Sequence, residues 1–277
     1  MIELGQYNHL CVARDTSAGL FLEDDNGNEV LLPGKFMPEK ELEEGDYLSV
    51  FVYKDNQGRY IATTQEALIT IDNFALLEVR EVGKYGAFMI MGIDKDLLVP
   101  FMEQNKRMET GEKHLVYMYL DGITNRLTGS AKIEQFLEQD DIELEEGQEV
   151  EVLFWKFSDL GLKVIINETY EGLIYKDQLF DKIRFGDRQK AYIHHIRPDG
   201  KIDVRLQKEG YAKVEPNAAK ILEQLKNNDG FLLLTDKSSP EDIREKLGMS
   251  KKTFKKSIGS LYKQRLILLG DKGIRLV

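Results

Sequence analysis

The feature that most constrains this sequence is an internal repeat. A glycine inside an apolar run, Gly19 in one copy and Gly86 in the next, is followed fourteen residues later by the proline of a Leu-Leu-Pro or Leu-Val-Pro box. A second glycine, an aspartate, a basic residue and a Thr or Ser then follow in the same order with matched gaps. A weaker third copy starts at Gly161 and has Tyr175 at the fourteenth position. Self-similarity of this kind predicts several copies of one small structural unit, and it has to be recognised before the fold is assigned.

Each copy predicts five short β-strands. In the second copy they cover about residues 75–82, 86–91, 97–100, 114–120 and 127–131, which are rich in Val, Ile, Leu, Phe and Tyr. The glycines inside these strand patterns indicate the bends that allow a small sheet to curl. Five curled strands in about 65 residues predict a small closed barrel, because closure leaves no strand edge exposed.

The C-terminal part has a helical pattern instead. Apolar residues at helical spacing predict a helix over 217–227, and a Ser-Pro start with a glycine stop predicts another over 240–247. A third helix is predicted from 251 to about 265, and residues 267–276 predict a terminal hairpin. A helix, a helix-turn-helix and a hairpin in this order are typical of a winged helix.

We therefore predict a mainly β multidomain protein of 277 residues. Three five-stranded barrels are expected over 1–66, 67–138 and 139–208, followed by an α+β winged-helix domain over 209–277. The single cysteine, Cys11, excludes a disulfide framework and favours a cytoplasmic protein. No apolar stretch approaches the roughly 18 residues that a membrane helix needs, so no membrane partner is expected.

Charge is spread unevenly along the chain. The net charge is −10, and residues 1–66 alone carry five basic and thirteen acidic side chains. Residues 209–277 carry fourteen basic and nine acidic side chains, a net +5. This distribution argues against nucleic-acid binding by bulk electrostatics, but it leaves room for local contacts and for the basic C-terminal domain.

The repeat motif resembles the RNA-binding OB fold first named from ribosomal protein S-one. Three such barrels followed by a winged helix resemble the bacterial family of conserved virulence factor B, and residues 247–256 are similar to the winged-helix signature of that family. The resemblance covers essentially the whole chain. It implies a cytoplasmic, non-enzymatic RNA-binding protein that influences the expression of virulence genes.

The resemblance also implies an aromatic pair on the second strand that stacks on bases. Only the second copy has both rings, Tyr85 and Phe88, whereas the first copy keeps Phe21 alone. The third copy has neither ring, but Tyr175 occupies the position of the family's histidine. Exposed aromatic rings bind single strands with little sequence preference, at roughly 1–3 kcal/mol per base. The alternative is that Tyr85 and Phe88 are core residues, since side chains three apart in a regular strand point to opposite faces.

Each copy further has an aspartate and a basic residue before its fifth strand. The pairs are Asp55 with Arg59, Asp121 with Arg126 and Asp199 with Lys201. We expect the basic residue to contact phosphate or a ring, and the aspartate to orient its neighbour or accept from a base edge. Solvated turn charges are the alternative interpretation. The candidate RNA-binding residues of the barrels are Phe21, Arg59, Tyr85, Phe88, Asp121, Arg126, Tyr175 and Lys201, and the middle barrel is the most complete.

The third predicted helix of the C-terminal domain has a basic face. Phe254, Ile258 and Leu261 fall together at 100° per residue and are expected to face the core. The lysines on the opposite face are candidates for contacts with phosphate, in single-stranded or duplex nucleic acid. These candidates are Lys252, Lys256 and Lys263. An ordinary solvated face, or a protein-docking surface, is the alternative.

No catalytic or metal-binding constellation stands out, so we expect a protein that is not an enzyme and uses no cofactor. The expected partner is single-stranded RNA. One alternative is a DNA-binding transcription regulator that acts through the winged helix. Another is a protein scaffold on the ribosome or RNA polymerase, which the acidic first barrel would suit.

Overall fold

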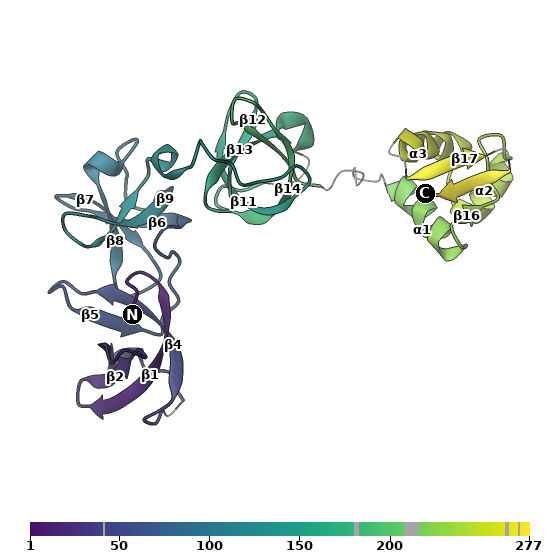
Figure 1. The fold of residues 1–277 in the computed structure, drawn as a ribbon. Coiled ribbons are helices and arrows are strands. Elements are labelled where there is room, and N and C mark those ends of the chain that lie inside the picture. Colours follow the sequence, from purple (N-terminus) through teal and green to yellow (C-terminus); the bar gives the residue numbers. More distant parts are fainter. Residues whose placement is uncertain (41, 180–182, 208–215, 264–265, 271) are drawn as a thin grey trace. The chain divides into compact units, whose positions relative to one another are not determined.

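The computed structural model describes residues 1–40, 42–179, 183–207, 216–263, 266–270 and 272–277 (Figure 1). It contains three closed five-stranded barrels and a C-terminal domain of three helices and a three-stranded sheet. The predicted fold class, mainly β and multidomain with a winged helix, is confirmed. The chain has two compact units: the first includes both N-terminal barrels, the second includes the winged helix, and the third barrel contributes strands to each. No helix in the described ranges is long and apolar enough to cross a bilayer.

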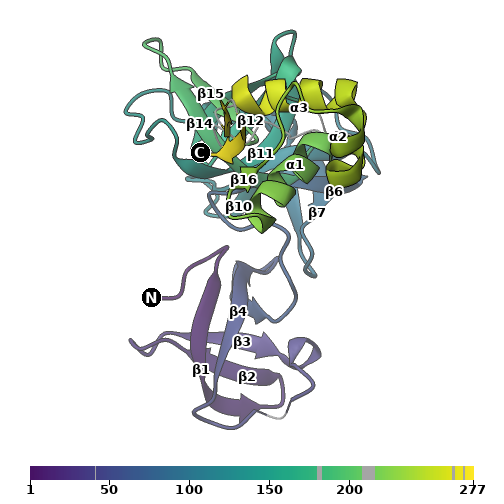
Figure 2. The ribbon, with the colours of Figure 1, turned by 90° about the vertical axis from the view of Figure 1, so that its right-hand side faces the viewer.

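The first barrel has its strands in the order β1-β2-β3-β5-β4. Figure 2 shows β1 to β4 curling around a common interior. That interior is filled by apolar side chains from alternate strand positions, among them Leu22, Leu32 and Val50, which are fully buried. The strands are β1 (Tyr7–Thr16), β2 (Gly19–Glu23), β3 (Glu29–Pro33), β4 (Tyr47–Lys54) and β5 (Tyr60–Thr63), with a short 3-10 helix η1 (Gly34–Phe36) after β3.

The second barrel repeats this plan. Its strands are β6 (Phe74–Val82), β7 (Gly86–Ile90), β8 (Asp96–Pro100), β9 (Lys113–Leu120) and β10 (Leu127–Ser130), with η2 (Phe101–Glu103) after β8. Each predicted strand agrees with the observed one to within a residue at either end. The agreement follows from clear turn signals, because glycine or a short polar side chain marks most of the ends.

The weaker third copy also closes into a barrel, in the order β11-β12-β13-β15-β14. Its strands are β11 (Glu149–Phe157), β12 (Gly161–Ile166), β13 (Tyr170–Tyr175), β14 (Arg188–Ile196) and β15 (Ile202–Arg205). Two 3-10 helices, η3 (Ile133–Phe136) and η4 (Lys176–Gln178), lie before β11 and after β13. The repeat therefore survives the replacement of the proline of the box by Tyr175.

The repeat spacing has a direct structural cause. The glycine on the second strand of each barrel stands opposite the residue fourteen positions later, in the pairs Gly19 with Pro33, Gly86 with Pro100 and Gly161 with Tyr175. A Cβ atom on any of the three glycines would lie 2.0–2.2 Å from a carbonyl oxygen of the opposite strand. Only glycine permits this close approach, and a β-bulge on the first strand of each barrel adds to the curl.

The C-terminal domain is a winged helix. The Oγ atom of Ser239 accepts a hydrogen bond from the backbone N–H of Asp242, and Gly248 ends the second helix in the left-handed conformation, as predicted. The short strand β16 was not predicted, because two residues carry no periodic signal. The elements are α1 (Pro216–Asn227), β16 (Phe231–Leu232), α2 (Pro240–Leu247), α3 (Lys251–Lys263), β17 (Ile267–Gly270) and β18 (Gly273–Leu276). The predicted end of the third helix near Arg265 lies outside the described residues.

Candidate nucleic-acid interface

A hollow of about 600 Å³ lies within the first compact unit. One side is the outer face of the second barrel, and the other is the β4–β5 turn of the first barrel. The structure brings four predicted site residues together here and adds two that the sequence did not suggest, Lys95 and Asn56. The predicted four are Tyr85, Phe88, Asp121 and Arg126.

The two aromatic rings line the same hollow although they are three residues apart. Tyr85 precedes the first residue of β7, so strand alternation does not apply to it, and its side chain is 67% exposed. Phe88 lies within β7 and is half-buried, packed close to Gly83. Neither ring is among the fully buried core residues. Both therefore have surface available for a planar ligand such as a base.

The Asp121 side chain does not orient Arg126 through an ion pair, one of the two roles expected of it. The Asp121 carboxylate accepts hydrogen bonds from the backbone N–H of Thr124 at 2.6 Å and from its hydroxyl at 2.7 Å. These bonds hold the pKa of Asp121 below its ordinary value and show that the carboxylate stabilises its own turn. The Arg126 guanidinium instead donates to the backbone carbonyl of Asn56 in the first barrel, at 3.5 Å.

Lys95 is a further cation that lines the hollow, together with Arg126 and Lys54. It lies in the turn before β8, and its ammonium donates to the side-chain oxygen of Asn56. Partial burial lowers the pKa of Lys95, and the nearby charge of Arg126 lowers it further. A lysine in a turn gives no sequence signal of this role, because the role depends on a neighbouring barrel.

The equivalent face of the first barrel is blocked. The guanidinium of Arg14 lies over the Phe21 ring, with its carbon 3.8 Å from the ring centroid, and Glu29 binds the same guanidinium at 2.6 Å. Arg59 pairs with Asp55 at 2.7 Å, as the sequence suggested. Phe21 and Arg59 thus both have partners within their own barrel.

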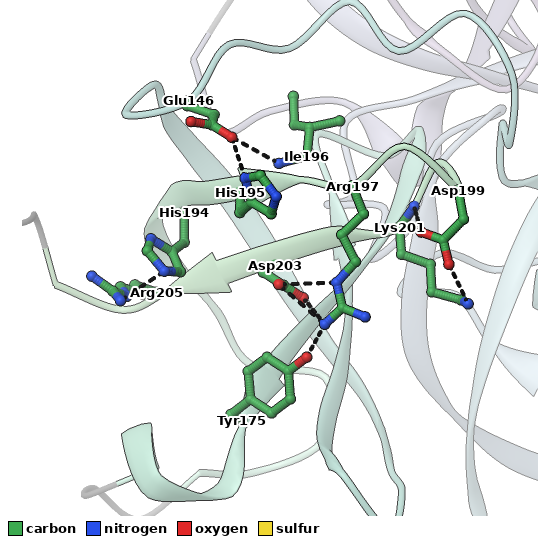
Figure 3. Close-up of polar contacts among 10 residues, drawn as sticks. All are labelled: Glu146, Tyr175, His194, His195, Ile196, Arg197, Asp199, Lys201, Asp203 and Arg205. Atoms are coloured by element: carbon green, nitrogen blue, oxygen red, sulfur yellow. Dashed lines mark hydrogen bonds and ion pairs between the residues drawn. The ribbon is translucent and has the colours of Figure 1, made fainter.

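The third barrel has a hollow of about 710 Å³ on its equivalent face. Figure 3 shows Arg197 between Tyr175 and Asp203: the guanidinium donates to the Tyr175 hydroxyl and pairs with Asp203 at 3.0 Å. Lys201 pairs with Asp199 at 2.7 Å, also visible in Figure 3. Tyr175 is half-buried and held by this network, so it offers less surface than Tyr85.

One feature that the three repeats share was not detected in the sequence. The tenth residue after each repeat glycine is acidic, and it binds a cation on the same face of its barrel. The pairs are Glu29 with Arg14 at 2.6 Å, Asp96 with Arg80 at 2.9 Å, and Glu171 with Lys163 at 2.8 Å. The constant spacing from the glycine was the signal that could have revealed it. In each barrel this acidic residue engages one cation in an ion pair.

The winged helix presents its lysines as predicted. Lys252, Lys256 and Lys263 are exposed on α3, and the opposite stripe is buried. That stripe consists of Phe254, Ile258 and Leu261. A side chain added at Gly259 would meet nothing within 4 Å, so the helix surface there is open.

Comparison with known proteins agrees with this architecture. Residues 4–65 match the S1 domain family, and residues 219–276 match the CvfB-like winged helix domain. The resemblance to conserved virulence factor B is confirmed. Both domains belong to classes that commonly bind nucleic acid, the OB-type barrel and the helix-turn-helix.

Full-length relatives extend the likeness over most of the chain. Conserved virulence factor B of Staphylococcus saprophyticus is 26% identical over 263 residues, which cover 92% of this chain and 88% of the relative. The uncharacterized protein YitL of Bacillus subtilis is 29% identical over 271 residues, covering 94% and 89%. A crystal structure of a multidomain protein with nucleic acid binding domains from Streptococcus pneumoniae is 25% identical, covers 99% of this chain and 98% of its own, and has a TM-score of 0.44.

Proposed function

We propose that this protein binds single-stranded RNA, chiefly on the middle barrel, and acts as a non-enzymatic post-transcriptional regulator. The observation that carries the proposal is the hollow beside Tyr85, where an exposed ring and a half-buried ring lie next to two cations. Aromatic faces stack on bases, and lysine or arginine neutralises the phosphates between them. These are the two elements that binding of a single strand needs.

A duplex is a poorer fit for this hollow. Its bases are stacked on one another and present only their edges, so an aromatic face has nothing to stack on. The other barrels and the winged helix add weaker contacts with the same strand. Because the domains are linked, several modest sites act at high effective concentration and together give useful affinity.

The biological setting of the proposal comes from the relatives. Several are named conserved virulence factor B, and we extend to this chain a role in the expression of virulence genes. We also place the protein in the cytoplasm, where RNA is found and where a lone cysteine such as Cys11 remains reduced.

The experiment is a titration of the full chain with a labelled single-stranded RNA and with a duplex DNA of the same sequence, at one salt concentration. The proposal expects the single-stranded RNA to bind more tightly. No binding of RNA, or equal binding of both, would contradict it.

The lysine face of α3 favours a second candidate function, binding of duplex DNA through the winged helix. Tighter binding of the duplex in the same titration would support a DNA-binding regulator instead. A helix-turn-helix places its second helix in the major groove, so this outcome should depend on Lys252, Lys256 and Lys263.

A further inference from the structure

Lys95 and Arg126, two cations that line the hollow of the second barrel, do not pair with the carboxylates of the same hollow. Four carboxylates line it, and each already has a partner. Asp55 binds Arg59, Asp94 binds Lys35, Asp96 binds Arg80, and Asp121 accepts from Thr124. Within the described part of the chain, neither Lys95 nor Arg126 forms an ion pair with a carboxylate. The acidic groups of the hollow are thus committed, whereas Lys95 and Arg126 are not; the third cation of the lining, Lys54, donates to the Asn125 carbonyl.

These two cations converge on one residue of the other barrel. Lys95 donates to the side-chain oxygen of Asn56, and Arg126 donates to its backbone oxygen. Burial lowers the pKa of Lys95, and the nearby charge of Arg126 lowers it further, so the two cations repel each other. Neutral amide oxygens relieve this repulsion only partly, whereas an anion between the two cations would relieve it fully. Two adjacent cations that form no ion pair with a carboxylate of the described residues are the arrangement expected of an anion site.

We propose that Lys95 and Arg126 of the second barrel and Asn56 of the first barrel form one phosphate-binding site for the strand that stacks on Tyr85 and Phe88. This inference rests on the proposed function and names a part of its site. The phosphodiester replaces Asn56 as the partner of both cations, and the Asn56 amide nitrogen donates to the strand. That nitrogen makes no hydrogen bond with the described residues.

The first barrel therefore contributes to the binding site of the second barrel. Its own stacking face is covered by Arg14, yet its β4–β5 turn completes the neighbouring site. A further contact holds the two barrels in register at this point, since the Lys54 ammonium donates to the Asn125 carbonyl at 3.0 Å. The very acidic first barrel therefore contributes to binding without contacting a base.

The test uses the full chain and a labelled oligouridine, titrated at several salt concentrations. Asn56→Asp puts a carboxylate between the two cations, and Lys95→Gln removes one of them. We expect each to weaken binding by about tenfold, since a charge-assisted contact is lost. Each should also flatten the slope of log K against log salt by about 0.7, the value for one phosphate of a single strand. Lys113→Gln is the matched control, because Lys113 is an exposed lysine of the same barrel outside this hollow.

The outcomes separate this inference from the function on which it rests. If the wild type binds oligouridine and Asn56→Asp binds equally well with the same salt slope, the shared site is wrong and the proposed function stands. If the wild type does not bind, both are wrong. Binding of uridine monophosphate as tight as that of oligouridine would also overturn the proposal, because it would assign the site to a free nucleotide.

Discussion

The guanidinium of Arg14 covers the ring of Phe21, with its carbon 3.8 Å from the ring centroid. In the second barrel the equivalent ring is Phe88, and the residue opposite it on the first strand is Glu81 in place of Arg14. Among the described residues no cation lies over the Phe88 ring. One substitution between the repeats thus separates a closed stacking face from an open one. Arg14 is also paired with Glu29 at 2.6 Å, so a base has to displace Arg14 from the ring before it can stack on Phe21.

The first prediction concerns the open face. Phe88→Ala combined with Arg126→Ala removes a half-buried ring and a cation from the hollow. We expect the dissociation constant for single-stranded RNA to rise by roughly 5- to 150-fold, the equivalent of about 1–3 kcal/mol. Fluorescence anisotropy with the full chain measures this, and thermal unfolding checks that the barrel remains folded.

The control for this variant is Phe21→Ala combined with Arg14→Ala, which removes the same residue types from the equivalent face of the first barrel. Because these two side chains contact each other, we expect the RNA affinity to stay within about twofold of the wild type. Equal losses in both variants would show that the two barrels bind alike.

The second prediction concerns the lysine face of α3. Changing Lys252, Lys256 and Lys263 to glutamine should flatten the salt dependence of RNA binding by up to about two units, because each neutralised phosphate contributes about 0.7. All sequences should be weakened alike, since phosphate contacts carry no base information. Binding measured from low to moderate salt tests this. A wild-type slope would leave the winged helix as a structural or protein-docking domain.

The third prediction concerns the repeat glycines. A Cβ atom at Gly86 would lie 2.2 Å from the Val99 carbonyl oxygen, so Gly86→Ala should destabilise the second barrel by about 3 kcal/mol. Gly259→Ala is the contrasting variant, because its Cβ meets nothing within 4 Å and alanine favours the helix by about 1 kcal/mol. The urea midpoint of unfolding should fall for Gly86→Ala and rise for Gly259→Ala.

The fourth prediction concerns acid stability. Hydrogen bonds from His114, from the backbone N–H of Glu109 and from Lys106 lower the pKa of Glu112 from 4.5 to about 2. Because the folded pKa is lowered, the stabilisation is fully present above the unfolded value and is lost as the pH falls from 4.5 toward 2. Urea midpoints across this window should therefore fall less steeply for Glu112→Gln than for the wild type. Glu109→Gln, whose side chain is not part of this contact, should keep the wild-type dependence.

The fold could be predicted from the sequence because its signals are local. Strand patterns, turn residues and the fourteen-residue spacing follow from contacts between adjacent strands, and the register of Gly86 with Pro100 shows that the spacing has a steric origin. The helix cap at Ser239 and the left-handed Gly248 are equally local. Among the strands of the described residues only β16 was missed, because its two residues pair through a strand far along the chain.

The candidate site could be predicted only in part. Tyr85, Phe88 and Arg126 belong to one repeat and follow from its motif. Asn56 and Lys95 do not, because their meeting depends on how two barrels pack, and no periodic pattern encodes that packing. The contact between Arg14 and the Phe21 ring could not be predicted for a related reason, because it is made across two neighbouring strands.

The most direct measurement of the central claim is ultraviolet crosslinking of the full chain to single-stranded RNA, followed by mass spectrometry of the crosslinked peptides. Rings that stack on bases are the preferred partners in such a reaction, and Tyr85 is 67% exposed beside the hollow. We expect the crosslinks to concentrate on the peptide that contains Tyr85 and Phe88. Crosslinks confined to the first barrel or to α3, with none on that peptide, would contradict it.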